Sequence, residues 1–208
     1  MINLKILKIL PLIILLLVLS PARSFADMPD ISAGETYFDI LKGYYVLKDN
    51  VHVVIKNHGV TATITANEAK VNVLTQKCWA EGKVNLTHDK ETFSCDRAYL
   101  QWQTKTAEVI GNVKFKSKKV MSVTSETAVF NWSEKIVDFY GNIKVKAEKN
   151  LKLEDGLKVE KKIYSHVKYN VIENKILQLE EDTDAPNIEI PNPDDDKPTE
   201  ESVENEAN

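Results

Sequence analysis

The chain has 208 residues, with 27 Lys or Arg, 31 Asp or Glu and a formal net charge of −4. This length predicts one folded domain with extensions, and the charge balance gives no indication of nucleic-acid binding. The four histidines and two cysteines lack metal-site spacing, and no phosphate-binding loop or nucleophile elbow occurs. We therefore expect no metal, no cofactor and no enzymatic activity.

The first 26 residues have the pattern of a secretory signal peptide. Lys5 and Lys8 precede an apolar run over 9–19, and Ser24 and Ala26 place small residues at the positions that determine cleavage. The run is shorter than the ~20 residues that a membrane-spanning helix needs. We expect residues 1–26 to be removed on export, and their retention as an anchor remains an alternative.

A short pattern then recurs along the chain. It reads Asp49-Asn50-Val51, Gly82-Lys83-Val84, Gly111-Asn112-Val113 and Gly141-Asn142-Ile143. Steps of 33, 29 and 30 residues separate the last members of these copies. Such a period indicates one supersecondary unit stacked on copies of itself.

Apolar residues alternate with polar ones within each unit, which predicts β-strands with one dry face and one wet face. The three glycines lie inside this alternation, so we expect bends there and not hairpin tips. The tips are expected at four polar clusters, over residues 88–91, 103–106, 117–119 and 133–135. Each repeat is therefore predicted to be a pair of strands.

Two features could mislead a search for chemistry. The acidic residues Glu68, Asp96 and Glu126 recur once per repeat, which indicates a structural place and not a catalytic one. Cys78 and Cys95 could pair after export, but a turn near residues 89 and 90 would place Cys95 opposite Val84. Their redox state is left open.

The composition changes after Leu179. Residues 180–208 hold twelve Asp or Glu, one Lys and four of the seven prolines. Such a segment buries too little apolar surface to offset its chain entropy, so we expect a disordered acidic tail. The predicted domains are a signal peptide over 1–26, a β-domain over 27–179 and a tail over 180–208.

The dry face holds the candidate binding residues. In a stack of two-stranded repeats the inner faces need not close fully, and small residues such as Ala98 and Ala128 would leave an open apolar groove for lipid chains. Lys114, Lys116 and Lys144 alternate with these residues and are expected on the wet face. The expected groove residues are Val51, Val53, Ile55, Val84, Leu86, Leu100, Trp102, Val113, Phe115, Phe130, Ile143 and Val145.

With the export signal and these repeats, the chain resembles the OstA/LptA family of lipopolysaccharide-transport proteins over about residues 43–147, with a less regular continuation to 179. The return segments also carry the resemblance: Thr65 to Ala69, Ser94 to Ala98 and Thr124 to Ala128. It implies a slightly open, twisted β-jellyroll in the periplasm. Such a protein shelters the acyl chains of lipopolysaccharide, at its lipid A region, and bridges the inner and outer membranes.

The resemblance also implies partners. These are transporter subunits at both membranes and further copies joined head to tail, with candidate edges at residues 37–41 and 163–171. Two alternatives are an inner-membrane-tethered, LptC-like accessory of the same transporter and a structural or carbohydrate-binding β-repeat protein.

Overall fold

The computed structural model describes residues 30–57, 60–72, 75–88, 91–181, 184 and 186–195. In these ranges the chain is all-β, as predicted, apart from one short 3-10 helix, η1 (Pro193–Asp195). None of the described helical structure is long and apolar enough to cross a membrane. The strands are β1 (Asp30–Ser32), β2 (Glu35–Asp39), β3 (Tyr44–Asn57), β4 (Val60–Asn72), β5 (Lys77–His88), β6 (Glu91–Gln101), β7 (Thr106–Ser117), β8 (Met121–Asn131), β9 (Ile136–Ala147), β10 (Lys152–Leu153), β11 (Tyr164–Asn170) and β12 (Lys175–Glu180).

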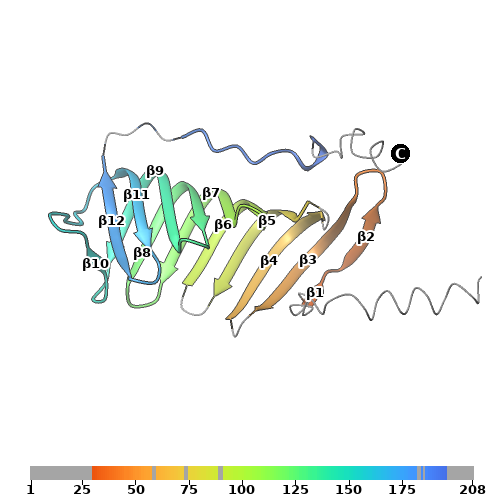
Figure 1. The fold of residues 1–208 in the computed structure, drawn as a ribbon, viewed down its shortest axis with the longest axis horizontal. Helices are drawn as coiled ribbons and strands as arrows, with labels where there is room; N and C mark the ends of the chain where they lie inside the picture. Colours follow the sequence, from red (N-terminus) through yellow and green to blue (C-terminus); the bar gives the residue numbers. More distant parts are fainter. Residues whose placement is uncertain are drawn as a thin grey trace, which may run out of the picture.

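All these strands belong to one open sheet (Figure 1). From β3 to β9 each strand pairs antiparallel with the next along the chain, and β11 and β12 continue the series. At one end β1 and β2 both pair with β3; at the other, β10 pairs parallel with β12. Tandem hairpins therefore build the sheet, as the repeat predicted. Val84 pairs with Cys95, as predicted from the turn position.

Most strands bend at their middle, where the recurring sequence pattern lies. Gly111 and Asn112 have φ of 83° and 48°, and Gly141 and Asn142 have 73° and 45°. The sheet register shifts at these pairs, between Ile110 and Val113 for example. A φ in this range is open to glycine at little cost and to asparagine more readily than to most residues. The repeated motif therefore makes a corner, and the prediction that its glycines bend the strands is confirmed.

The acidic residues of the repeat cover these corners. Asp96 lies over Gly111 and Glu126 lies over Gly141, so closely that a Cβ on either glycine would overlap the carboxylate. At the preceding corner the residue over Gly82 is Asn67 and not its neighbour Glu68. The structural role predicted for Asp96 and Glu126 is thus confirmed, whereas the assignment of Glu68 to that place is wrong by one residue.

The corners divide the sheet into two facing walls. The first wall contains the half-strands with Ala98, Ala128 and Phe139, and the second contains those with Val84, Phe93 and Phe115. Rings from opposite walls are in contact, with 5.5 Å between the centroids of Phe115 and Phe139. The core is therefore the layer between the walls. Every second side chain of each strand points into this layer and packs against the opposite wall.

The end of the sheet at β10 to β12 is closed by packing. Tyr164, Val167, Tyr169 and Ile176 are fully buried there. The irregular segment after β9 adds more apolar side chains against the same core: Leu151, Leu153, Leu157 and Val159. At the opposite end the core begins with the smaller side chains of Leu47 and Val51.

The predicted edges agree only in part with this topology. β2 covers most of residues 37–41 and lies at an edge, as expected. The expectation for residues 163–171 is wrong, because β11 lies between β9 and β12 and pairs with both. A short parallel strand, β10, extends the sheet beyond β12, and two-residue strands give no periodicity from which to predict them.

Candidate functional site

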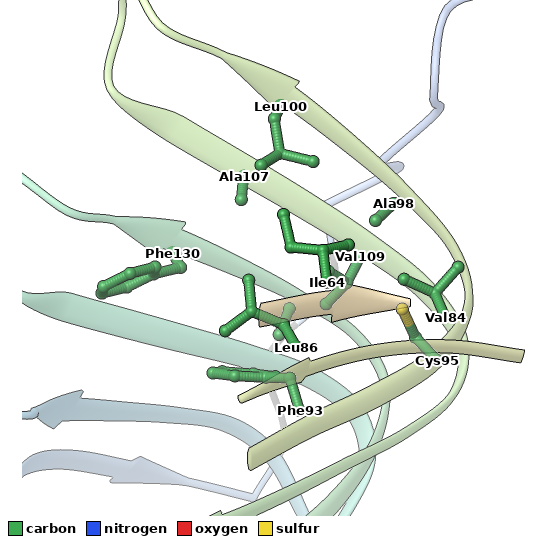
Figure 2. A pocket seen from close by; sticks show the side chains of 11 residues that line it. Ile64, Val84, Leu86, Phe93, Cys95, Ala98, Leu100, Ala107, Val109 and Phe130 are labelled. Carbon is green, nitrogen blue, oxygen red and sulfur yellow. The ribbon is translucent and has the colours of Figure 1, made fainter. Parts of the chain in front are cut away.

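An apolar cavity lies between the two walls, over strands β4 to β8 (Figure 2). Leu86 and Phe93 enter it from the second wall, and Leu100 and Phe130 from the first. Each of these comes from the strand parity that faces inward. The full lining is Ile64, Val84, Leu86, Phe93, Cys95, Ala98, Leu100, Ala107, Val109, Ala128 and Phe130. A site with this lining attracts hydrocarbon and offers no side-chain group for polar recognition.

Small side chains on the first wall make the room for this cavity. One row of paired residues crosses the strands in the order Ala69, Ala80, Ala98, Val109, Ala128 and Phe139. Methyl groups therefore face the second wall over several strands, until the Phe139 ring ends the row. The cavity ends there because the aromatic side chain fills the gap between the walls.

Phe93, which lines the cavity, forms a cluster with three aromatic rings of the core beyond it. We call these four rings the aromatic plug: Phe93, Phe115, Phe139 and Tyr169. The Phe115 ring centroid lies 4.6 Å from that of Phe93 and 5.7 Å from that of Tyr169. Contacts at these separations are favourable beyond the area that they bury. The plug separates the cavity from the closed end of the sheet.

The cavity is narrow as it stands. Its volume open to a water-sized sphere is about 40 Å³, whereas an apolar cavity that holds benzene measures about 150 Å³. An acyl chain can therefore enter only if the two walls move apart. Widening the gap costs the dispersion contacts between the walls, which the methylenes of the chain would replace at about 0.8 kcal/mol each.

The titratable groups near the cavity do not form a reactive site. Burial raises the pKa of the Cys95 thiol to about 12, with a further contribution from Asp96, and burial alone raises that of Cys78 to about 12. Both thiols are free and stay protonated near neutral pH. Among the described residues, no three His, Cys, Asp or Glu side chains are grouped in a way that could hold a metal ion.

Lysines gather on the outer face of the second wall. Through the strand register, Lys114 pairs with Thr124, which pairs with Lys144, and Lys116 pairs with Ser122, which pairs with Lys146. All four lysines are exposed. They form a basic patch of two pairs on β7 and β9.

The structure brings most of the predicted groove residues to the space between the walls. Leu86, Leu100 and Phe130 line the cavity together with Val84. Val51, Val113, Phe115 and Ile143 are buried in the core beyond it, and Val53 and Val145 are half-buried against that core. The side chain of Ile55 lies outside the described part of the chain.

Trp102 has a different position. It follows β6 in the turn, is 39% exposed, and contacts Trp132 edge to face with 6.3 Å between ring centroids. It therefore lies at the rim of the gap. The alternation of apolar and polar residues did not predict this position, because β6 ends at Gln101 and Trp102 is no longer part of a strand.

Sequence reasoning also missed five lining residues on the inward parity: Ile64, Phe93, Cys95, Ala107 and Val109. Phe93 is part of an alternating strand and was recognisable by parity. The closed end was harder to predict, because the segment that covers it is irregular.

Comparison with known proteins agrees with this architecture. The family described as OstA-like protein matches residues 48–180. Among curated proteins, none is significantly similar to the chain. A solved structure with a similar fold is LptH from Pseudomonas aeruginosa, described as the LptA homologous periplasmic component of the lipopolysaccharide transport device. The TM-score is 0.51 at 12% identity, covering 59% of this chain and 96% of LptH.

The family match spans most of the sheet, from Lys48 in β3 to Glu180, the last residue of β12. It thus includes every corner, both walls and the cavity. The chain therefore belongs to the OstA-like family, which consists of binding and transport proteins and not of enzymes.

Proposed function

We propose that this protein binds lipopolysaccharide in the periplasm and carries it between the inner and outer membranes. The observation that carries this proposal is the cavity lined only by apolar side chains between the walls of an open sheet. Membership of the OstA-like family and a fold like that of a lipopolysaccharide-transport component support the same class of ligand.

In this proposal the acyl chains of the lipid A region lie between the walls. They contact Leu86, Leu100 and Phe130 first, since these line the present cavity. Widening extends the contact toward the other predicted groove residues, such as Val53 at the β3 end and Val113 near the plug. Head-group phosphates stay in water, where the basic patch of Lys114, Lys116, Lys144 and Lys146 attracts them.

The proposal also includes export and partners. Residues 1–26, which lie outside the described part of the chain, direct export and are cleaved, so that the mature protein begins at Asp27. Transporter subunits at both membranes are its partners, and copies join head to tail through sheet edges. N-terminal sequencing of the exported protein tests the first point, because retention of residues 1–26 would indicate the tethered accessory.

A photo-crosslinking residue placed at two neighbouring positions tests the groove. Phe130 lines the cavity, whereas Val129 lies on the same strand with the opposite parity. In cells that make lipopolysaccharide, we expect capture of the lipid from position 130 and at least tenfold less from position 129. Equal capture from both positions would contradict binding between the walls.

A further inference from the structure

The outer face of the first wall also carries buried apolar side chains. Tyr44, Val46, Trp79 and Tyr99 are only 2%, 3%, 6% and 4% exposed. Successive residues of a strand point to opposite faces. Cys78 and Leu47 pack in the core between the walls, so their neighbours Trp79 and Val46 point to the outer face. The ring centroids of Trp79 and Tyr99 lie 5.3 Å apart. A wet face was expected here, so something other than the opposite wall must cover these rings.

A segment of the acidic tail covers Tyr44 and Trp79. Residues 186–195 run along the sheet in the direction of β3 (Figure 1). The indole Nε1–H of Trp79 donates a hydrogen bond of 2.9 Å to the Pro191 carbonyl. Farther on, Asp194 accepts one of 2.8 Å from the Tyr44 hydroxyl and one of 2.6 Å from Lys42 Nζ. We call residues 190–194 the strap.

The chemistry of these contacts is that of peptide recognition. Pro191 precedes η1 and Pro193 begins it. Each proline ring fixes one backbone dihedral of the strap, so less chain entropy is lost on docking. Aromatic grooves bind such proline-containing segments in many proteins. The charge match is local to Asp194, which forms an ion pair with Lys42. Around the rest of the strap, Lys70 and Arg97 are balanced by Glu68 and Glu81. The strap thus matches the surface in its hydrogen bonds and, at Asp194, in charge.

The strap does not fill this surface completely. A space of about 350 Å³ lies between Ile190 to Pro193 and the wall residues Glu68, Lys70, Trp79, Glu81 and Arg97. It is large enough for several waters and has polar groups to bind them. A contact made through two hydrogen-bonding points beside a wet space can dissociate without unfolding the sheet.

The chain that links β12 to the strap is short, which limits how far the strap can reach. Six strand-to-strand steps separate β12 from β5 in the sheet, a distance of about 29 Å at ~4.8 Å per step. Residues 181–190 span at most about 33–36 Å when fully extended. The linker therefore reaches its own site with little slack, and it keeps the strap at a high local concentration there.

We propose that Tyr44, Trp79 and Tyr99 form a second binding site, which takes an acidic, proline-containing peptide and is occupied in this chain by its own residues 190–194. The site lies on the opposite face from the lipid cavity. It is independent of the proposed function, and a protein that bound no lipid would still have it.

The first test measures whether the strap docks in the intact chain. NMR of the full-length protein reports the exchange of the Trp79 indole proton with water. We expect slow exchange in the parent and at least tenfold faster exchange in Asp194→Lys. The matched control is Asp184→Lys, which makes the same charge change in the linker. Fast exchange in the parent, or equal acceleration by the control, would overturn the proposal.

The second test measures recognition of the peptide itself. A fluorescein-labelled peptide of residues 186–197 is added to the full-length Asp194→Lys protein, whose own strap is weakened. We expect saturable binding, and its loss when Trp79→Phe is added, which keeps a ring but removes the indole donor. Circular dichroism and thermal unfolding check that the double variant is folded. Absence of binding to Asp194→Lys, or equal binding with and without the indole, would contradict the proposed site.

Discussion

Asp96 covers Gly111 across the strand pair β6 and β7, and its Oδ2 accepts a hydrogen bond of 2.8 Å from the Asn112 side-chain amide. Glu126 has the same relation to Gly141 and Asn142. The carboxylate, the glycine and the asparagine thus act as one unit that fixes the bend. The sixteen-residue separation of each acid and asparagine explains why they recur together along the sequence.

Gly111→Ala should destabilise the protein more than an alanine at an open glycine. Position 111 combines a φ of +83° with overlap between the new Cβ and Asp96, and Gly156 has the same φ with no atom within 4 Å of that position. We expect the free energy of unfolding to fall by about 2–4 kcal/mol for Gly111→Ala and by about 1–2 kcal/mol for Gly156→Ala. Urea denaturation measures both free energies. Equal losses would show that the Asp96 carboxylate moves away from the new Cβ at no cost in stability.

Alanine substitutions at Phe115 and Phe130 should distinguish a core-packing role from a lipid-contact role. Phe115 is 1% exposed within the aromatic plug, and Phe130 is half-buried at the cavity. Phe115→Ala should lower the free energy of unfolding by about 3–5 kcal/mol. Phe130→Ala should cost less stability but weaken lipopolysaccharide binding by at least tenfold. Denaturation and lipid-binding titrations on both variants check this, and the reverse order of effects would contradict the placement of the groove.

The two thiols should react very slowly in the folded protein. Burial raises the pKa of Cys78 and Cys95 from 9.0 to about 12. The reactive thiolate is then about a thousandfold rarer at pH 8 than for an exposed thiol. Alkylation should accelerate to ordinary rates in urea, as followed by mass spectrometry. Rapid labelling of Cys95 without denaturant would show that the cavity opens to solvent readily.

The same shifts predict a loss of stability in alkali. A raised pKa means that the folded state holds the proton more tightly than the unfolded state. The stabilisation from the neutral thiols is complete below pH 9.0 and is lost as the pH rises toward about 12. The melting temperature should therefore fall across this range, and by less in a Cys78→Ala and Cys95→Ala double variant. An identical alkaline decline in the double variant would assign the effect to other groups.

Acid should release the strap. Hydrogen bonds from Lys42 and Tyr44 lower the pKa of Asp194 below its ordinary value of 3.8. The contact is therefore present above that value and is lost as the pH falls through the lowered pKa. The Trp79 indole resonance should shift in this acidic range and remain constant above it. In Asp194→Asn the shift should be absent, whereas Asp184→Asn should behave as the parent.

The sequence contained enough information to predict both walls and their corners. Alternation determines which residues share a face, so the inward positions of Val84, Leu100 and Phe115 followed from parity alone. The glycines marked the bends because few other residues adopt their backbone conformation. Counting from the turn gave the pairing of Val84 with Cys95.

Other features depend on contacts between distant segments and left weaker signals. The bond from Trp79 to Pro191 joins residues 112 positions apart, and the tail composition alone indicated disorder. Tyr44, Trp79 and Tyr99 lie on a face where alternation predicts exposure. The aromatic plug has the parity of the groove, so periodicity could not distinguish residues that fill the interior from residues that line a space.

The bent strands have one more consequence. Because each strand from β3 to β9 continues from one wall into the other through its corner, the walls cannot slide past each other or separate as independent layers. The gap between them can change only by rotation about a hinge axis that joins the corners. The Gly-Asn pairs would then determine the stiffness of that hinge, and with it how wide a hydrocarbon the protein can accommodate.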